Sequence, residues 1–123
     1  MSLSTKVRKV NDVNIVDVTG RITLGDGAST LRDTLSGMGK EGYKKILLNL
    51  AETTAVDSSG LGVLVSGFAS IANHGGSLKL VNLPNRIRDL LLITKLFTVF
   101  EVFEDETAAV RSFTEATMPA GRV

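Results

Sequence analysis

ILLNLAETTAVDSSGLGVLVSGFASI, residues 46–71, is the stretch that decides the fold of this chain. It opens with an apolar segment at 46–50 that has the character of a β-strand, and the polar segment 51–54 follows as a predicted loop. From 61 to 72, apolar residues recur every three or four positions, which is the spacing of one helix face. The positions predicted to face the core are Leu61, Leu64, Val65, Phe68 and Ala72. The pattern predicts a strand, a short loop and a helix.

Asp57 and Ser58 stand where this helix begins. Their oxygen atoms can accept hydrogen bonds from the unpaired N–H groups of the first helical turn, so a capping cluster is the simplest interpretation of these residues alone. The same position puts a hydroxyl beside a carboxylate at the positive end of the helix dipole, where a phosphate group is tolerated. A cap and a phosphate acceptor both stay open at this point.

The composition predicts one globular domain. With 123 residues, of which 43% are hydrophobic and 22% charged, the chain can build a single core and has no room for a second domain. We expect this domain to cover 1–123, with frayed ends at 1–4 and 119–123. There is no run of about 18 apolar residues and no apolar signal segment, so we expect a cytoplasmic protein without a membrane span.

Charge and residue usage argue against several classes of function. The net charge of +1 and the aromatic content of 5% do not fit a nucleic-acid-binding protein. The absence of cysteine excludes disulfides and thiolate metal sites and fits a reducing compartment. The one histidine, His74, is expected to end the helix and cannot form a zinc site by itself. We expect no metal and no cofactor.

The rest of the chain alternates strand and helix patterns. In order, these are a hairpin over 6–10 and 13–19, a loop over 24–27, a helix from 29 that ends at Gly39 or Gly42, a strand over 45–49, a strand over 77–81, a helix over 86–94, an edge strand within 97–102 and a helix over 104–118. The core positions expected in the last two helices are Ile87, Leu90, Leu91, Ile93, Ala108, Val110, Phe113 and Ala116. The strand at 45–49 is mostly apolar, so we expect it at the centre of the sheet, with parallel neighbours. The predicted fold class is α/β: a mixed sheet of about five strands, with about four helices packed mainly on one face.

No arrangement of residues predicts catalysis. A serine hydrolase needs a base for Ser58 or Ser59, but His74 lies a helix length away and there is no G-x-S-x-G elbow. The loop at 25–27 lacks the lysine of a P-loop. The aspartates that could bind magnesium come from separate elements, namely Asp12, Asp17, Asp26 and Asp57. We therefore expect no enzyme, and a hydroxyl that serves as the substrate of another protein.

Four segments carry a resemblance to a known family. They are ILLNL at 46–50, VDSSGLGVL at 56–64, GGSLKL at 75–80 and LF at 96–97. With them, the chain resembles an anti-sigma factor antagonist of the STAS-domain family, over nearly its whole length. The specific part is the DSSGLG run after an apolar strand, and the resemblance implies a single STAS-like domain.

The resemblance also implies a bacterial partner-switching regulator. The serine directly after the motif aspartate, which is Ser58 here, is phosphorylated by an anti-sigma factor that is also a serine kinase. The unphosphorylated antagonist binds the anti-sigma factor and frees the sigma factor, and phosphorylation releases it. A serine phosphatase of the metal-dependent class restores the first state. ATP and magnesium belong to the kinase, so this chain needs no cofactor.

Alternatives stay open for the acceptor, the surface and the function. Ser59 is the second candidate acceptor, and Thr53 and Thr54 are others. The residues expected to bind the partner are Asp26, Asp57, Ser58, Ser59, Gly60, Gly62 and Ser66. The small residues of the helix, from Gly62 to Ser70, equally fit a solvent face or a tight helix contact inside the domain. The alternative function is a non-catalytic scaffold or ligand-binding STAS module without phosphorylation, and a hydrolase that uses Ser58 is the third.

Overall fold

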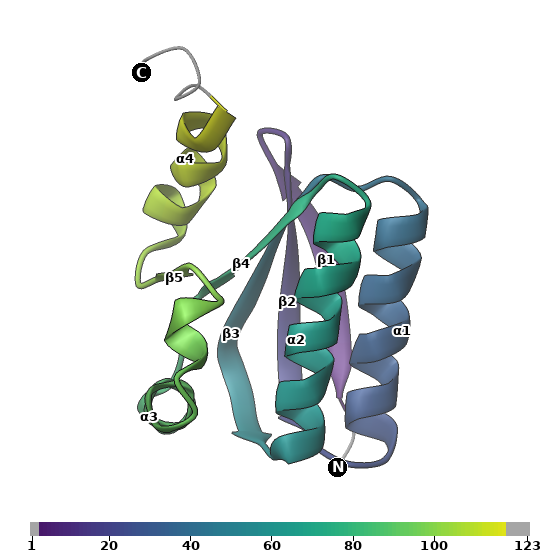
Figure 1. Ribbon diagram of the computed structural model, residues 1–123, viewed down its shortest axis with the longest axis vertical. Helices are drawn as coiled ribbons and strands as arrows, with labels where there is room; N and C mark the ends of the chain where they lie inside the picture. The colour runs from purple at the N-terminus through teal and green to yellow at the C-terminus, as the bar shows by residue number, and fades with distance from the viewer. Residues whose placement is uncertain (1–2, 118–123) are drawn as a thin grey trace.

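The computed structural model describes residues 3–117, and it has the predicted order of strands and helices (Figure 1). The strands are β1 (Ser4–Val10), β2 (Val13–Ile22), β3 (Lys45–Val56), β4 (Ser77–Val81) and β5 (Val102–Phe103). The helices are α1 (Asp26–Lys40), α2 (Ser58–Asn73), α3 (Asn85–Ile93), the 3₁₀ helix η1 (Leu96–Thr98) and α4 (Glu106–Thr117). No helix within 3–117 has the length and apolar character needed to cross a membrane.

The five strands form one mixed sheet in the order β1-β2-β3-β4-β5. β1 and β2 pair antiparallel as the predicted hairpin around Asn11, whose φ of 58° lies in the left-handed region that such turns require. β2, β3, β4 and β5 pair in parallel through helical crossovers. β3 therefore lies at the centre, as the sequence predicts.

β3 is longer than its apolar pattern indicates, so the predicted loop at 51–54 is wrong. The second half of β2 runs past the hairpin and pairs with this polar segment, and the ladder contains two register shifts. Thr53 is buried, and its hydroxyl donates to the carbonyl oxygen of Val18 at 3.2 Å. A polar segment can remain a strand here because its backbone is paired and its buried hydroxyl has an acceptor.

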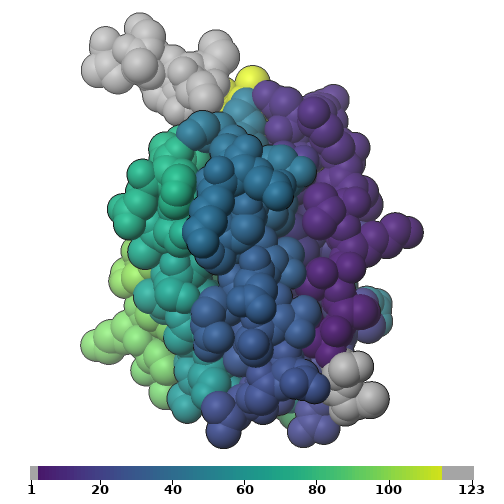
Figure 2. Space-filling model, turned by 90° about the vertical axis from the view of Figure 1, so that its right-hand side faces the viewer, coloured from purple at the N-terminus to yellow at the C-terminus, as the bar shows by residue number. Residues whose placement is uncertain are grey.

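Helices cover both faces of the sheet, but unequally (Figure 1). The larger core lies under α1, α2 and α3, and α1 and α2 pack side by side over it (Figure 2). α4 covers the opposite face through Ala109, Val110 and Phe113. β2 supplies both cores, since Val13 and Ile15 face α4 whereas Val16 and Val18 face the larger core. The expected packing of helices mainly on one face is confirmed.

The core side of α2 is rotated from the predicted one. Its buried residues are Gly60, Val63, Leu64, Gly67 and Ile71. Val65 and Ala72 are exposed instead of buried, and Leu61 and Phe68 lie at the edge of the core. The cause is α1, whose Leu35 packs directly against α2 at Gly67. The approach is so close that a Cβ on Gly67 would lie only 2.5 Å from a methyl carbon of Leu35. For Gly67, the tight helix contact inside the domain is therefore the correct alternative.

Several boundaries and core positions also differ from the prediction. α1 begins at Asp26 within the predicted loop, and it ends before Gly42, whose φ is 89°. Residues 96–98 form η1, so the edge strand is only Val102–Phe103. In α3, the predicted core residue Ile93 is instead 77% exposed. In α4, Ala109 is buried in place of the predicted Ala108. The side chain of Ala116, also predicted in the core, lies outside the described part of the structure.

The chain ends are described only in part. Leu3 is buried and Ser4 already belongs to β1, so fraying is wrong for these two residues. Residues 1–2 and 118–123, the remainder of the ends predicted to fray, lie outside the described residues.

Candidate functional site

The candidate site lies where the first turns of α1 and α2 meet the carboxyl end of β2. Asp57 is the N-cap residue of α2 and has extended backbone angles. One of its carboxylate oxygens, Oδ1, accepts from the backbone N–H of Gly60 at 2.9 Å, and the other, Oδ2, accepts from that of Leu24 at 2.9 Å. The hydrogen bond from Leu24, followed by that from Gly60, lowers the pKa of Asp57 below its ordinary value. This carboxylate joins the loop before α1 to the start of α2.

Two glycines allow both helices to begin this close to β2. A Cβ on Gly27 would overlap the carbonyl oxygen of Arg21, and a Cβ on Gly60 would overlap that of Ile22. The glycine of the DSSG run is therefore required by a close backbone approach. Gly60 is buried in the first turn of α2, so it supports the site from inside, and its expected contact with a partner stays a prediction.

Ser58 is the first residue of α2, and its side chain is exposed. Among the described residues, no group forms a hydrogen bond with its hydroxyl. The adjacent N–H groups and the helix dipole favour negative charge at this place. The hydroxyl is accessible to an approaching active site, and a phosphate on it would stand at the positive end of α2.

The rival acceptors have different surroundings. Ser59 is half-buried in the first turn of α2. Thr53 is buried and donates to a carbonyl, as described above. Thr54 is exposed, and its hydroxyl donates to the carbonyl oxygen of Gly20 at 3.2 Å. Among these four hydroxyls, only that of Ser58 belongs to an exposed residue and has no hydrogen-bond partner in the described part of the chain.

The other expected partner-binding residues lie near this end or along α2. Asp26 is exposed in the first turn of α1, two residues after the amide that Asp57 holds. Gly62 is exposed with open space around its Cα, and Ser66 is exposed further along α2. Sequence reasoning missed Leu24, whose side chain is 80% exposed at the same end. The only signal for it was a leucine directly before a glycine in a polar segment.

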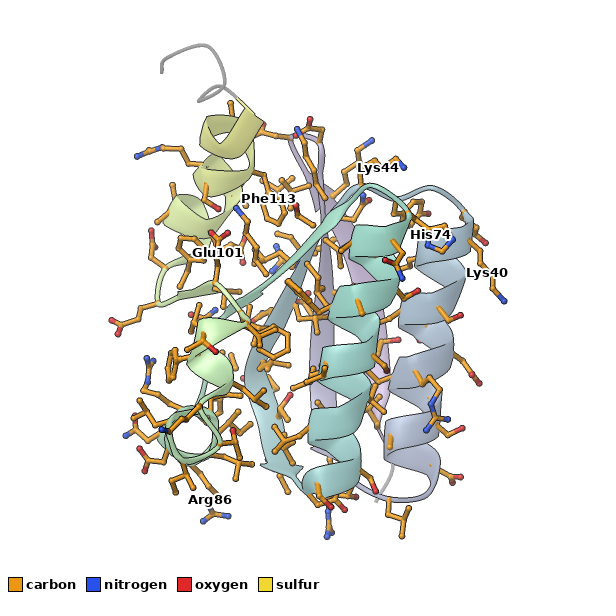
Figure 3. The ribbon with its side chains drawn as sticks, viewed as in Figure 1. Lys40, Lys44, His74, Arg86, Glu101 and Phe113 are labelled. Carbon is orange, nitrogen blue, oxygen red and sulfur yellow. The ribbon has the colours of Figure 1, made fainter. Side chains whose placement is uncertain are left out.

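Catalytic and metal-binding groups do not surround Ser58 in the described structure. His74 caps the opposite end of α2, where its ring nitrogen Nδ1 lies 2.8 Å from the carbonyl oxygen of Ser70 (Figure 3). Asp12 pairs with Lys45, and Asp17 pairs with Arg8. Among residues 3–117, no three His, Asp or Glu side chains come together as a metal site.

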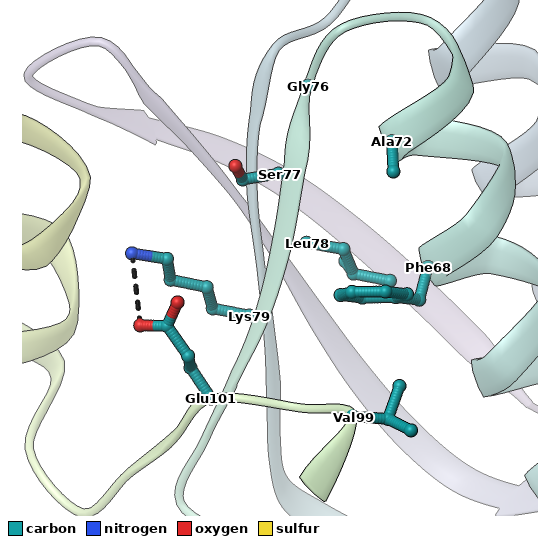
Figure 4. A pocket seen from close by; sticks show the side chains of 8 residues that line it. All are labelled: Phe68, Ala72, Gly76, Ser77, Leu78, Lys79, Val99 and Glu101. Atoms are coloured by element: carbon teal, nitrogen blue, oxygen red, sulfur yellow. Dashed lines mark ion pairs between the residues drawn. The ribbon is translucent and has the colours of Figure 1, made fainter. Parts of the chain in front are cut away.

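A separate concavity lies at the outer edge of β4, between α2 and the segment that follows η1 (Figure 4). Its volume is about 230 Å³. Phe68 and Val99 line its apolar side, and on the other side of β4 the Lys79 ammonium lies 3.4 Å from the Glu101 carboxylate. Lys79 also donates to the hydroxyl of Ser112 in α4 at 3.0 Å. This lysine therefore holds α4 against the sheet.

Comparisons with known sequences identify one family. The family model described as STAS domain matches residues 4–109. The anti-sigma-B factor antagonist of Bacillus subtilis is 33% identical over 103 residues, which cover 83% of this chain and 92% of that protein. A Thermotoga neapolitana homologue of the protein TM1081 is 34% identical over 70 residues, which are 57% of this chain but only 62% of that protein, less than two thirds of its length.

Solved structures share the fold. An anti-sigma factor antagonist from Mycobacterium paratuberculosis matches with a TM-score of 0.80 and 20% identity, over 90% of this chain and 93% of that one. The Bacillus cell fate determinant SpoIIAA in its phosphorylated form matches with a TM-score of 0.69 and 17% identity, over 89% of this chain and 99% of that one. At these identities, the likeness establishes the architecture of the chain and nothing further.

Proposed function

The chain belongs to the STAS domain family, and from this premise we propose that it is a cytoplasmic anti-sigma factor antagonist controlled by phosphorylation of Ser58. The observation that carries the proposal is the Ser58 hydroxyl, which is exposed at the start of α2 and has no hydrogen-bond partner within residues 3–117. The similarity to the Bacillus subtilis anti-sigma-B factor antagonist supports the choice of partner class.

In the proposed cycle, the chain supplies a hydroxyl and no catalytic group. An anti-sigma factor that is also a serine kinase binds the unphosphorylated chain. The Ser58 oxygen forms a bond to the γ-phosphorus of ATP, the bond from this phosphorus to the β,γ-bridging oxygen breaks, and ADP leaves, while the hydroxyl proton passes to a base of the kinase. A metal-dependent serine phosphatase then transfers the phosphoryl group to water and releases inorganic phosphate. Magnesium and ATP are bound by the kinase, so the chain itself needs no cofactor.

The physical effect of the phosphate is expected at the surface and not in the fold. A phosphoserine carries nearly two negative charges, and the dipole of α2 offsets part of their cost while Asp57 opposes them. α2 has no charged residue of its own, and the Asp57 carboxylate directly precedes Ser58, so the phosphate adds a bulky dianion where a partner must pack. A partner that packs on the start of α2 must then desolvate the dianion, and its affinity falls.

Phosphate mapping tests the proposal. The purified chain is incubated with the anti-sigma factor kinase and ATP, and the modified residue is located by mass spectrometry. We expect one phosphate, on Ser58, and none in a Ser58→Ala variant. A Ser59→Ala variant is the matched control and keeps full incorporation. Unchanged incorporation in Ser58→Ala would contradict the assignment.

A scaffold or ligand-binding module without covalent control is the second candidate. It predicts that the partner binds the wild type and a Ser58→Asp variant equally well. We expect instead that Ser58→Asp binds the anti-sigma factor kinase more weakly, because a second carboxylate beside Asp57 must be desolvated where the partner packs.

A further inference from the structure

We propose that Leu24 is an apolar anchor of the kinase-binding surface, and this inference rests on the proposed function. Among the large apolar side chains of the described residues, Leu24 is the most exposed, at 80%, followed by Ile93 at 77% and Leu92 at 58%. Ile93 and Leu92 lie together at the end of α3. Leu24 is the one whose backbone is hydrogen-bonded to Asp57, the residue directly before Ser58.

The segment Thr23-Leu24-Gly25 is held by three hydrogen bonds, of which one is made by Leu24 itself. Its own N–H donates to the Asp57 carboxylate at 2.9 Å. On either side of it, the carbonyl oxygen of Thr23 accepts from the N–H of Ala28 at 2.9 Å, and that of Gly25 accepts from the N–H of Ser29 at 3.1 Å. The loop is therefore fixed to the first turns of both helices, although its leucine side chain points into solvent.

A fixed, exposed leucine differs from the single exposed leucines that are common on protein surfaces. Its backbone is already ordered in the free protein, so a partner that buries the side chain loses little entropy in the loop. Such pre-organised apolar side chains, seated in a desolvated pocket, are where binding energy concentrates in protein interfaces. Since Asp57 holds Leu24 and directly precedes Ser58, a kinase that receives the Ser58 hydroxyl must approach this leucine.

The partner surface follows from the same geometry. Next to the cleft that accepts Ser58, the kinase must have an apolar pocket of the size of a leucine side chain. The carboxylates of Asp26 and Asp57 stand close to Leu24, so the rim of this pocket should carry positive charge. If a second copy of this chain bound here, its carboxylates would face the same carboxylates of the first copy. Their repulsion disfavours a second copy as the occupant of this surface.

Leu24→Ala and Ile93→Ala form a matched pair that tests the inference. The two leucine-sized side chains are almost equally exposed, so neither truncation should change the unfolding midpoint. The probe is the same anti-sigma factor kinase preparation that phosphorylates the wild type, and its Kd is measured by titration calorimetry without ATP. We expect Leu24→Ala to weaken binding about tenfold or more, and Ile93→Ala to change it by less than about twofold.

Each outcome separates the inference from the proposed function. If Leu24→Ala binds like Ile93→Ala while Ser58→Asp still weakens binding, the anchor is overturned and the proposed function stands. If the kinase neither binds nor phosphorylates the wild type, both are overturned. If Leu24→Ala only changes the sedimentation of the free chain from dimer to monomer, Leu24 serves self-association and the anchor is overturned.

Discussion

The carboxylate of Asp57 accepts the backbone N–H of Leu24, a residue 33 positions earlier, and with its second oxygen it caps α2 through Gly60. One side chain thus fixes two segments that the sequence separates by the whole of α1 and β3. This relationship makes the surface around Ser58 rigid before any partner arrives.

Replacing Asp57 by alanine should therefore have two effects. The loss of the cap should lower the free energy of unfolding by about 1 kcal/mol, measured by urea denaturation. Hydrogen exchange at the Leu24 amide should also become faster, by a larger factor than the loss of global stability accounts for. Asp57→Asn keeps one good acceptor and should retain most of the cap. Protection at Leu24 unchanged in Asp57→Ala would show that the loop is held by other contacts.

Gly60 and Gly62, two residues apart in α2, should respond in opposite directions to alanine. Gly62 has open space around it, so Gly62→Ala should stabilise the protein by about 0.5–1 kcal/mol through helix propensity alone. Gly60→Ala gains the same propensity but forces its Cβ into the Ile22 carbonyl, and it should destabilise by about 1–3 kcal/mol. Thermal unfolding of the two variants checks this difference. Equal midpoints would mean that α2 does not begin against β2 as described.

Arg8 links the hairpin to α4 and should make stability depend on pH. It pairs with Asp17 at 2.6 Å and with Glu106 at 2.8 Å. Hydrogen bonds from Arg8 are the largest cause that lowers the pKa of each carboxyl. The pKa of each carboxyl is therefore lower in the folded chain than in the unfolded chain. The two ion pairs contribute their full stabilisation above about pH 4–5. This contribution is lost as the pH falls through the pKa values of the folded chain.

An Arg8→Met variant keeps the apolar stem of the side chain and removes its charge. We expect the free energy of unfolding to fall less steeply in this variant than in the wild type between about pH 5 and pH 3. Lys9→Met is the control, because Lys9 is an exposed cation on the same strand without an ion pair among the described residues. Identical slopes for the wild type and Arg8→Met would contradict the role of the pairs.

The order of elements and the centre of the sheet were predictable because they depend on local patterns. The apolar run of β3, the DSSG cap and the glycines after α1 and α2 each carry their signal within a few neighbouring residues. The second half of β3 was missed because its strand state comes from pairing with β2 and from the acceptor that Val18 offers Thr53. Such non-local pairing leaves no apolar alternation in 51–54.

The site was predictable in part for the same reason. Asp57 and Ser58 were found because a helix start has a local signature. The rotation of α2 was missed because it depends on how closely Gly67 lets Leu35 approach. Leu24 was missed because its importance comes from a hydrogen bond to a residue 33 positions away.

The most direct test of the account compares the affinity of one anti-sigma factor kinase for the unphosphorylated chain and for the chain phosphorylated on Ser58. A non-hydrolysable ATP analogue keeps the phosphorylation state of Ser58 fixed during the titration. We expect phosphorylation to raise Kd about a hundredfold, which is about 2.8 kcal/mol, and phosphatase treatment to restore the first value while circular dichroism stays unchanged. Equal Kd values for the two forms would contradict the central claim.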